Sequence, residues 1–156
     1  MDTSTKNKIY GRAQTLVLCG FAAAVFLSAN APVLFRSARA VILGNALCAV
    51  GVILMLTAVV WLRRVIQIAP NPVEGGELIT AGVYRWLRHP IYTSIEIVMV
   101  GLFLRQPAAA VGATAVLVMV FLTVKVRYEE ALLTARYPAY AAYRRSSWGI
   151  FPGLHW

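Results

Sequence analysis

Residues 41–62, VILGNALCAVGVILMLTAVVWL, run for 22 positions without a charged side chain. A helix of about 20 apolar residues crosses the roughly 30 Å hydrocarbon core of a bilayer. This stretch therefore predicts a transmembrane helix, and three further apolar blocks occupy residues 14–35, 91–104 and 108–126. Together they predict an all-α fold: an integral membrane helical bundle with about four transmembrane helices, forming a single domain over residues 1–156.

The composition agrees with a membrane protein. The chain is 60% hydrophobic with a mean hydropathy of +0.69, whereas soluble domains are about 45–50% apolar. The net charge of +9 would indicate nucleic-acid binding in a soluble protein. Here the cations flank apolar blocks, so we predict contact with membrane lipids and no nucleic-acid partner. Cys19 and Cys48 lie within apolar blocks, where we expect them to be small core side chains rather than disulfide or metal ligands.

The distribution of Lys and Arg predicts the orientation. Three precede the first block, four lie in residues 63–90 and five lie from residue 125 onward, whereas only Arg36, Arg39 and Arg105 fall on the other side. Cytoplasmic loops carry the excess of cations. The sequence therefore places both termini, the 63–90 loop and the 127–156 segment on the cytoplasmic side, where the last two can meet.

The first block also has the features of a signal peptide. Lys6, Lys8 and Arg12 precede the apolar run, and Ala29-Asn30-Ala31 is similar to a cleavage motif. We favour a transmembrane helix, whose far end Pro32 is expected to kink.

The region around the third block departs from a simple membrane span. Residues 91–104 would extend over only about 21 Å as a helix, which suggests either a start near Tyr84 or one half of a tilted hairpin. The preceding 63–90 segment contains several prolines and glycines, which favours a loop with short helical turns over one continuous helix. The early Ala and Gly residues of the fourth block permit close helix packing.

Several polar residues near these blocks require an explanation. Glu96 lies inside the third block, where an ionisable group is costly and suggests either function or pairing with a loop arginine. Pro90 suits the first position of a helix, which would put His89 near its N-cap. Glu129 and Glu130 follow the fourth block, and Lys125 can pair with Glu129 at i, i+4.

The end of the chain predicts an amphipathic, interfacial helix. Tyr137, Tyr140 and Tyr143 recur at every third position and precede Arg144 and Arg145. Aromatic and basic residues in this pattern are typical of the membrane interface. Motif searches exclude other chemistries: the sequence has no phosphate-binding glycine loop, no metal-ligand spacing and no signature of covalent catalysis.

Residues 75–92, GGELITAGVYRWLRHPIY, resemble the signature of the isoprenylcysteine carboxyl methyltransferase and phospholipid methyltransferase superfamily. These are integral membrane enzymes that use S-adenosylmethionine. The pattern G-x-Y-x-x-x-R-H-P-x-Y is matched by Gly82, Tyr84, Arg88, His89, Pro90 and Tyr92, and the downstream pattern by Glu129, Glu130, Tyr140, Tyr143 and Pro152. The resemblance covers about residues 63–152. The family often has Gly shortly after R-H-P-x-Y, where this chain has Thr93-Ser94. It often has Phe-Gly before the C-terminal tyrosines, where this chain has Tyr137-Pro138.

The resemblance implies S-adenosyl-L-methionine as cofactor, S-adenosyl-L-homocysteine as product and a lipophilic acceptor, such as an isoprenylcysteine-like carboxylate, a phospholipid amine or another lipid-like molecule. It implies catalytic roles for Arg88, His89 and Glu130. The implied cofactor-binding residues are Gly76, Glu77, Leu78, Ile79, Tyr84, His89, Pro90, Ile91, Tyr92, Glu129 and Glu130. Lys125, Arg127 and Glu96 are candidates for binding the acceptor.

Two other functions compete with this interpretation. A small four-helix, proton-coupled multidrug transporter would use Glu96 as its membrane carboxylate, but it leaves the R-H-P-x-Y signature without a purpose. A non-catalytic membrane assembly factor could retain the same scaffold and bind the cofactor without turnover.

Overall fold

The computed structural model describes residues 2–62 and 78–153. Its elements, in chain order, are α1 (Thr3–Leu27), α2 (Ala38–Leu62), the 3-10 helix η1 (Gly82–Arg85), α3 (Pro90–Arg105), α4 (Ala109–Arg136) and α5 (Tyr140–Ser146). Over these described ranges there is no strand, only an isolated parallel bridge between Leu87 and Trp148. The predicted all-α class is confirmed.

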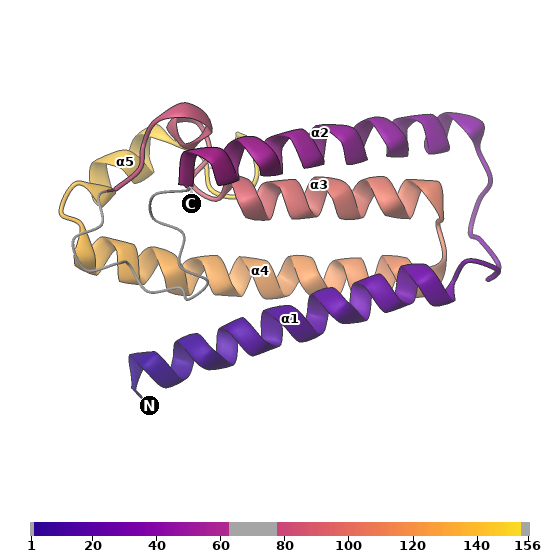
Figure 1. The fold of residues 1–156 in the computed structure, drawn as a ribbon, viewed down its shortest axis with the longest axis horizontal. Coiled ribbons are helices and arrows are strands. Elements are labelled where there is room, and N and C mark those ends of the chain that lie inside the picture. Colours follow the sequence, from indigo (N-terminus) through magenta and orange to yellow (C-terminus); the bar gives the residue numbers. More distant parts are fainter. Residues whose placement is uncertain (1, 63–77, 154–156) are drawn as a thin grey trace.

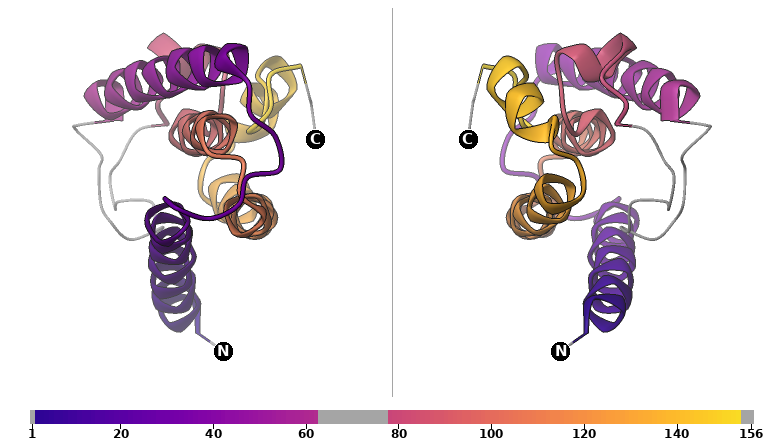
Figure 2. Two further views of the ribbon diagram at one scale, coloured as in Figure 1. Left: turned by 90° about the vertical axis from the view of Figure 1, so that its right-hand side faces the viewer. Right: turned by 90° about the vertical axis from the view of Figure 1, so that its left-hand side faces the viewer.

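The four long helices form two side-by-side pairs (Figure 1), α2 with α3 and α1 with α4. The end views place α3 between α2 and α4 (Figure 2). The short elements η1 and α5 gather at one end of the bundle, and the α1–α2 and α3–α4 connections lie at the other.

Among the described residues, α1, α2 and α4 are long and apolar enough to cross a membrane. Helix α3 has 16 residues and extends over about 24 Å, so it is the short helix that the sequence predicted. It does not begin near Tyr84: a separate 3-10 turn covers that position, and α3 begins at Pro90. Large apolar side chains, including Leu16, Phe26 and Ile53, are exposed on the outside of the bundle, which suits contact with lipid tails.

The bounds of two helices differ from those expected. Helix α1 begins at Thr3 rather than near residue 14 and ends at Leu27, before Pro32. The Ser28 amide donates to the Ala24 carbonyl and closes the helix, so Pro32 lies in a loop and kinks nothing. Helix α4 continues ten residues beyond the predicted boundary at 126. Hydropathy detects the apolar core of a helix but not its polar extensions.

Helix α1 is integrated into the bundle at its polar end. The Tyr128 hydroxyl of α4 donates to Asn7 Oδ1 at 2.7 Å. Tyr10 stacks on Tyr128 with ring centroids 4.7 Å apart. These contacts favour a membrane helix over a signal peptide.

Glycines allow α2 and α3 to approach closely. A Cβ atom on Gly44 would lie 2.6 Å from the Gly101 carbonyl oxygen, and one on Gly51 would lie 2.6 Å from Val98 Cγ2. Small residues permit such backbone approach between membrane helices. Gly112 plays a similar part in α4, where an added Cβ would lie 3.0 Å from the Phe103 ring.

The apolar core lies between α3, α4 and α1. Its buried members include Met99, Val118, Leu122 and Phe21. Cys19 is exposed, so the expectation that it is a core side chain is wrong: it lies on a face of α1 directed away from the other helices. Cys48 is half-buried, with its thiol 3.8 Å from the Val98 carbonyl oxygen.

Candidate active site

The R-H-P segment is fixed at the start of α3 by its own sequence. His89 is the N-cap residue and Pro90 the first helical residue. Proline suits this position because its φ angle is preset and its missing N–H would have no helical partner. The side chains of Arg88 and His89 are both buried. The abrupt start of α3 thus holds two cationic or polar side chains at the end of the bundle.

Gly82 positions the turn that precedes this segment. Its φ is +60°, and a Cβ atom there would lie 2.2 Å from Trp61 Cε2 at the end of α2. Only glycine adopts this conformation without strain and leaves room for the ring. The glycine of the G-x-Y pattern is therefore needed for the packing of η1 against α2.

The C-terminal segment is joined to the R-H-P segment by backbone hydrogen bonds. The Arg88 amide donates to the Trp148 carbonyl at 2.8 Å, and the Trp148 amide donates to the Trp86 carbonyl at 2.9 Å. The Tyr143 hydroxyl donates to the Tyr84 carbonyl at 2.5 Å. Burial raises the pKa of Tyr143 to about 12, so its hydroxyl remains a donor at neutral pH. These bonds hold α5 against the start of α3.

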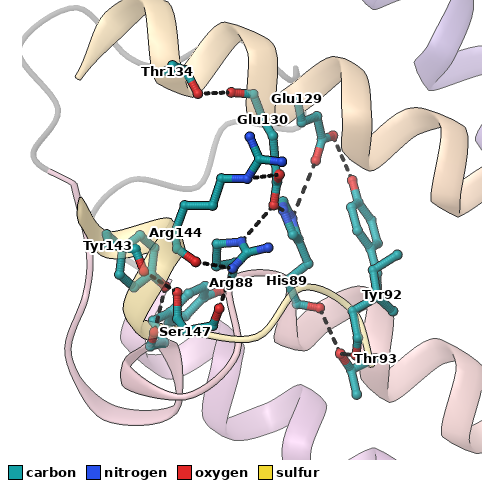
Figure 3. Close-up of polar contacts among 12 residues, drawn as sticks. Arg88, His89, Tyr92, Thr93, Glu129, Glu130, Thr134, Tyr143, Arg144 and Ser147 are labelled. Carbon is teal, nitrogen blue, oxygen red and sulfur yellow. Dashed lines mark hydrogen bonds and ion pairs between the residues drawn. The ribbon is translucent and has the colours of Figure 1, made fainter. Parts of the chain in front are cut away.

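Arg88 forms a buried ion pair with Glu130 (Figure 3). Its Nε donates to Glu130 Oε1 at 2.7 Å, and the two side chains are 1% and 10% exposed. Its Nη1 donates to the Arg144 carbonyl at 2.9 Å and also to the Ser147 carbonyl. One guanidinium therefore links α4 to the C-terminal segment.

His89 lies between the two glutamates. Its Nε2 is 3.3 Å from Glu130 Oε1, and its Nδ1 is 3.9 Å from Glu129 Oε2. Its ring lies nearly parallel to that of Tyr92, with centroids 5.8 Å apart and an interplanar angle of 11°. The Tyr92 hydroxyl donates to Glu129 Oε1 at 2.7 Å. R-H-P-x-Y and Glu129-Glu130, about 40 positions apart in the chain, are thus one cluster (Figure 3).

Lys125 completes the cluster on the α4 side. Its Nζ lies 3.4 Å from Glu129 Oε1, as the i, i+4 spacing predicted, and 5.3 Å from the centroid of the Tyr92 ring. It also donates to Gln14 Oε1 of α1. Arg127, predicted to share its role, is exposed on the same helix.

The predicted carboxylate in α3 lies one turn beyond Tyr92, on the same helical face. Glu96 is 4% exposed, and its Oε1 is buried without a hydrogen bond from any residue that the structure describes. The expected pairing with a loop arginine involves Arg63 or Arg64, which lie outside the described residues, or Arg85 or Arg88. Of these, Arg88 instead pairs with Glu130.

The remaining predicted cofactor residues differ in burial. Pro90 and Tyr84 are buried, and Ile91, Leu78 and Ile79 are half-buried; Gly76 and Glu77 lie outside the described residues. Burial also raises the pKa of Tyr84.

Sequence reasoning missed two members of the network, Arg144 and Ser147. Arg144 Nε lies 3.4 Å from Glu130 Oε2, and the Ser147 carbonyl accepts from Arg88. The recurring tyrosines predict a helix here, but the same pattern indicates that its basic residues lie at the membrane interface rather than in the site. The carboxylate pair has Arg88, Lys125 and Arg144 on its flanks, so the cluster joins hydrogen-bond acceptors and donors in one place.

Comparisons with known proteins identify the family and support the fold. Residues 39–140 match the family model of phospholipid methyltransferase, a range that contains every charged member of the cluster except Arg144. The chain is also similar in structure to the eukaryotic intramembrane Ras methyltransferase ICMT (isoprenylcysteine carboxyl methyltransferase), with a TM-score of 0.65 and 20% identity.

That likeness covers 99% of this chain, which spans 55% of the ICMT chain, and it supports the helical membrane fold. No curated protein sequence matches the chain. The family model covers well over half of the residues and includes the R-H-P-x-Y and Glu-Glu patterns. The chain therefore belongs to the phospholipid methyltransferase family.

Proposed function

We propose that this protein is a membrane-embedded methyltransferase that uses S-adenosyl-L-methionine to methylate a lipophilic acceptor. The observation that carries the proposal is the convergence of His89 and Tyr92 from α3 with Glu129 and Glu130 from α4. Family membership supports the reaction class, and the lysine and arginine distribution supports a cytoplasmic position for the site and both termini.

The residues of the cluster suit the cofactor. A bound S-adenosylmethionine would supply an electrophilic methyl group on a sulfonium. Glu129 would accept hydrogen bonds from its ammonium or ribose hydroxyls, and His89 would add a further hydrogen bond. The Tyr92 ring face attracts a cation, as its contact with Lys125 illustrates. Tyr84, Pro90, Ile91 and residues 76–79 would line the remainder of the site.

The contribution of this chain to methyl transfer would be alignment and exclusion of water. In-line displacement requires a positioned acceptor atom and little covalent help from the protein. His89 and Glu130 are both buried, which limits the access of water to them. Arg88, predicted to be catalytic, is occupied by Glu130 and two carbonyl groups. We therefore assign it a positioning role: it fixes Glu130.

The acceptor would enter from the bilayer, between helices. Glu96 lies on the Tyr92 face of α3, and its buried Oε1 would accept a hydrogen bond from the polar group of the acceptor. Lys125 lies beside Tyr92 and suits an anionic group. Arg127, exposed on α4, would instead meet an anionic group at the membrane surface. The acceptor atom, whether oxygen, nitrogen or sulfur, is left open by this assignment.

Binding calorimetry on the detergent-purified protein tests the proposal. We expect saturable binding of S-adenosyl-L-homocysteine, lost in His89→Ala and Glu130→Ala and kept in Arg39→Gln, which changes a charge at the other end of the bundle. No binding at millimolar ligand would refute the proposal. A screen of extracted lipids with labelled cofactor would then identify the acceptor, and binding without any transfer would favour the assembly factor.

A proton-coupled transporter is the second candidate, because Glu96 is buried and its Oε1 accepts no hydrogen bond from the described residues. That function predicts that Glu96→Gln abolishes transport of lipophilic cations by proteoliposomes while His89→Ala leaves it intact. The enzyme predicts the opposite dependence on His89. A transporter function does not explain the buried Arg88–Glu130 network, so we favour the enzyme.

A further inference from the structure

A second polar site lies at the end of the bundle opposite the candidate active site. The α1–α2 and α3–α4 connections, which meet at that end (Figure 1), line an open cavity of about 690 Å³. Its polar lining includes Asn30, Arg36, Ser37, Arg105 and Gln106. This volume falls within the range of about 300–1,000 Å³ that is usual for small-ligand sites.

The cavity is formed by two connections that are fixed to each other. The Leu34 amide donates to the Pro107 carbonyl at 2.8 Å. The Phe35 and Phe103 rings meet edge to face, with centroids 6.3 Å apart. The cavity therefore lies between packed segments.

The cavity is positively charged, because its described lining residues include two arginines and no carboxylate. Arg36 and Arg105 both line the cavity, and no ion pair formed among the described residues includes either of them. They are also two of only three cations on the side that the orientation rule leaves poor in Lys and Arg. The presence of two of these arginines at one cavity favours an anionic ligand.

Gln106 and Ser37 also line the cavity. Gln106 Nε2 is buried and donates to none of the residues described. Ser37 immediately precedes α2, a 25-residue helix that begins at Ala38, and its Oγ accepts from the Ala40 amide at 3.4 Å. The positive end of the helix dipole at this start favours anions. Guanidinium groups bind phosphate oxygens in a bidentate manner.

We propose that this cavity binds the phosphate group of a membrane lipid. A lipid is favoured over a soluble phosphate because apolar side chains at the cavity are exposed: Phe35 and Val41, which line it, are each 39% exposed, and the adjoining Leu34 is 66% exposed. These side chains would contact the acyl chains while the arginines hold the headgroup. The inference is independent of the proposed methyl transfer, since it involves neither the R-H-P segment nor the glutamates.

Native mass spectrometry of the full chain in detergent, titrated with phosphatidylglycerol, tests the proposal. Loss of one charge-assisted hydrogen-bond donor weakens binding by about tenfold. We expect that loss for Arg36→Gln and for Arg105→Gln, and a change below about twofold for Arg39→Gln. Arg39 is the matched control because it lies on the same side but outside the cavity lining. Arg105→Lys, which keeps the charge, should lose less affinity and serves if the glutamine variant does not fold.

Three outcomes would overturn the proposal. Equal weakening in Arg39→Gln would mean that the lipid binds by general surface charge, and unchanged affinity in all variants would mean that it binds elsewhere. Inorganic phosphate that binds with the same arginine dependence, while phosphatidylglycerol does not, would show a soluble anion to be the ligand. Melting temperatures of the lipid-free variants check that the fold is intact.

Discussion

Replacing Glu130 by alanine removes the acceptor that neutralises Arg88 inside the bundle. The Arg88 side chain is 1% exposed, and its Nε lies 2.7 Å from Glu130 Oε1. Its Nη1 also donates to the Arg144 and Ser147 carbonyls, which carry no full charge. Removing one partner of a buried ion pair costs about 3–5 kcal/mol. We therefore expect the free energy of unfolding to fall by about that amount.

Glu130→Gln should lower the free energy of unfolding by less than Glu130→Ala does. The amide oxygen can still accept from Arg88, so the loss is the difference between a charged and a neutral hydrogen bond, about 1–2 kcal/mol. Arg136→Gln, at the exposed end of the same helix, is the control and should change the unfolding free energy by less than about 0.5 kcal/mol. Tryptophan fluorescence during unfolding by a denaturing detergent measures all three variants. A loss below about 1 kcal/mol for Glu130→Ala would refute the reasoning, because it would mean that Arg88 is hydrated or paired elsewhere.

Three further predictions test other parts of the site. Tyr92→Phe keeps the ring but removes the 2.7 Å bond to Glu129, so cofactor affinity should fall about three- to tenfold with little change in melting temperature; unchanged affinity by calorimetry would contradict that role. Gly82→Ala places a Cβ atom 2.2 Å from the Trp61 ring at positive φ and should destabilise the fold by at least about 1 kcal/mol, an effect that Trp61→Ala should partly relieve if the contact is the cause. Glu96→Gln should leave cofactor affinity unchanged and lower the rate of methyl transfer to the acceptor, and a loss of cofactor binding instead would show that Glu96 belongs to the cofactor site.

The helical membrane fold could be predicted because its determinants are local. An uncharged run such as 41–62 has one stable arrangement in a bilayer, and Pro90 fixes the start of α3 by its own geometry. The bounds of α1 could not be predicted from the same signal. Residues 3–13 are polar yet helical, since the backbone bonds of a helix continue wherever tertiary contacts, such as Tyr128 with Asn7, support them.

The candidate site was predicted in its main residues but not in its full extent. His89, Tyr92 and the glutamates belong to a recognisable pattern, whereas Arg144 reaches Glu130 only because the chain folds back after α4. That fold-back depends on the backbone bonds of Trp148 with Trp86 and Arg88, and Trp86 and Trp148 are 62 positions apart. No periodicity in the sequence encodes such a contact. The close approach of Gly82 to Trp61 was hidden for the same reason.

The central claim is that the cluster of His89, Tyr92, Glu129 and Glu130 holds S-adenosylmethionine. Ultraviolet crosslinking of the labelled cofactor to the detergent-purified protein, followed by peptide mapping, tests it most directly. We expect label in the peptides that contain Tyr92 or Glu129. Excess S-adenosylhomocysteine should suppress this label, and His89→Ala should reduce it. Label confined to other peptides, or equal in heat-denatured protein, would contradict it.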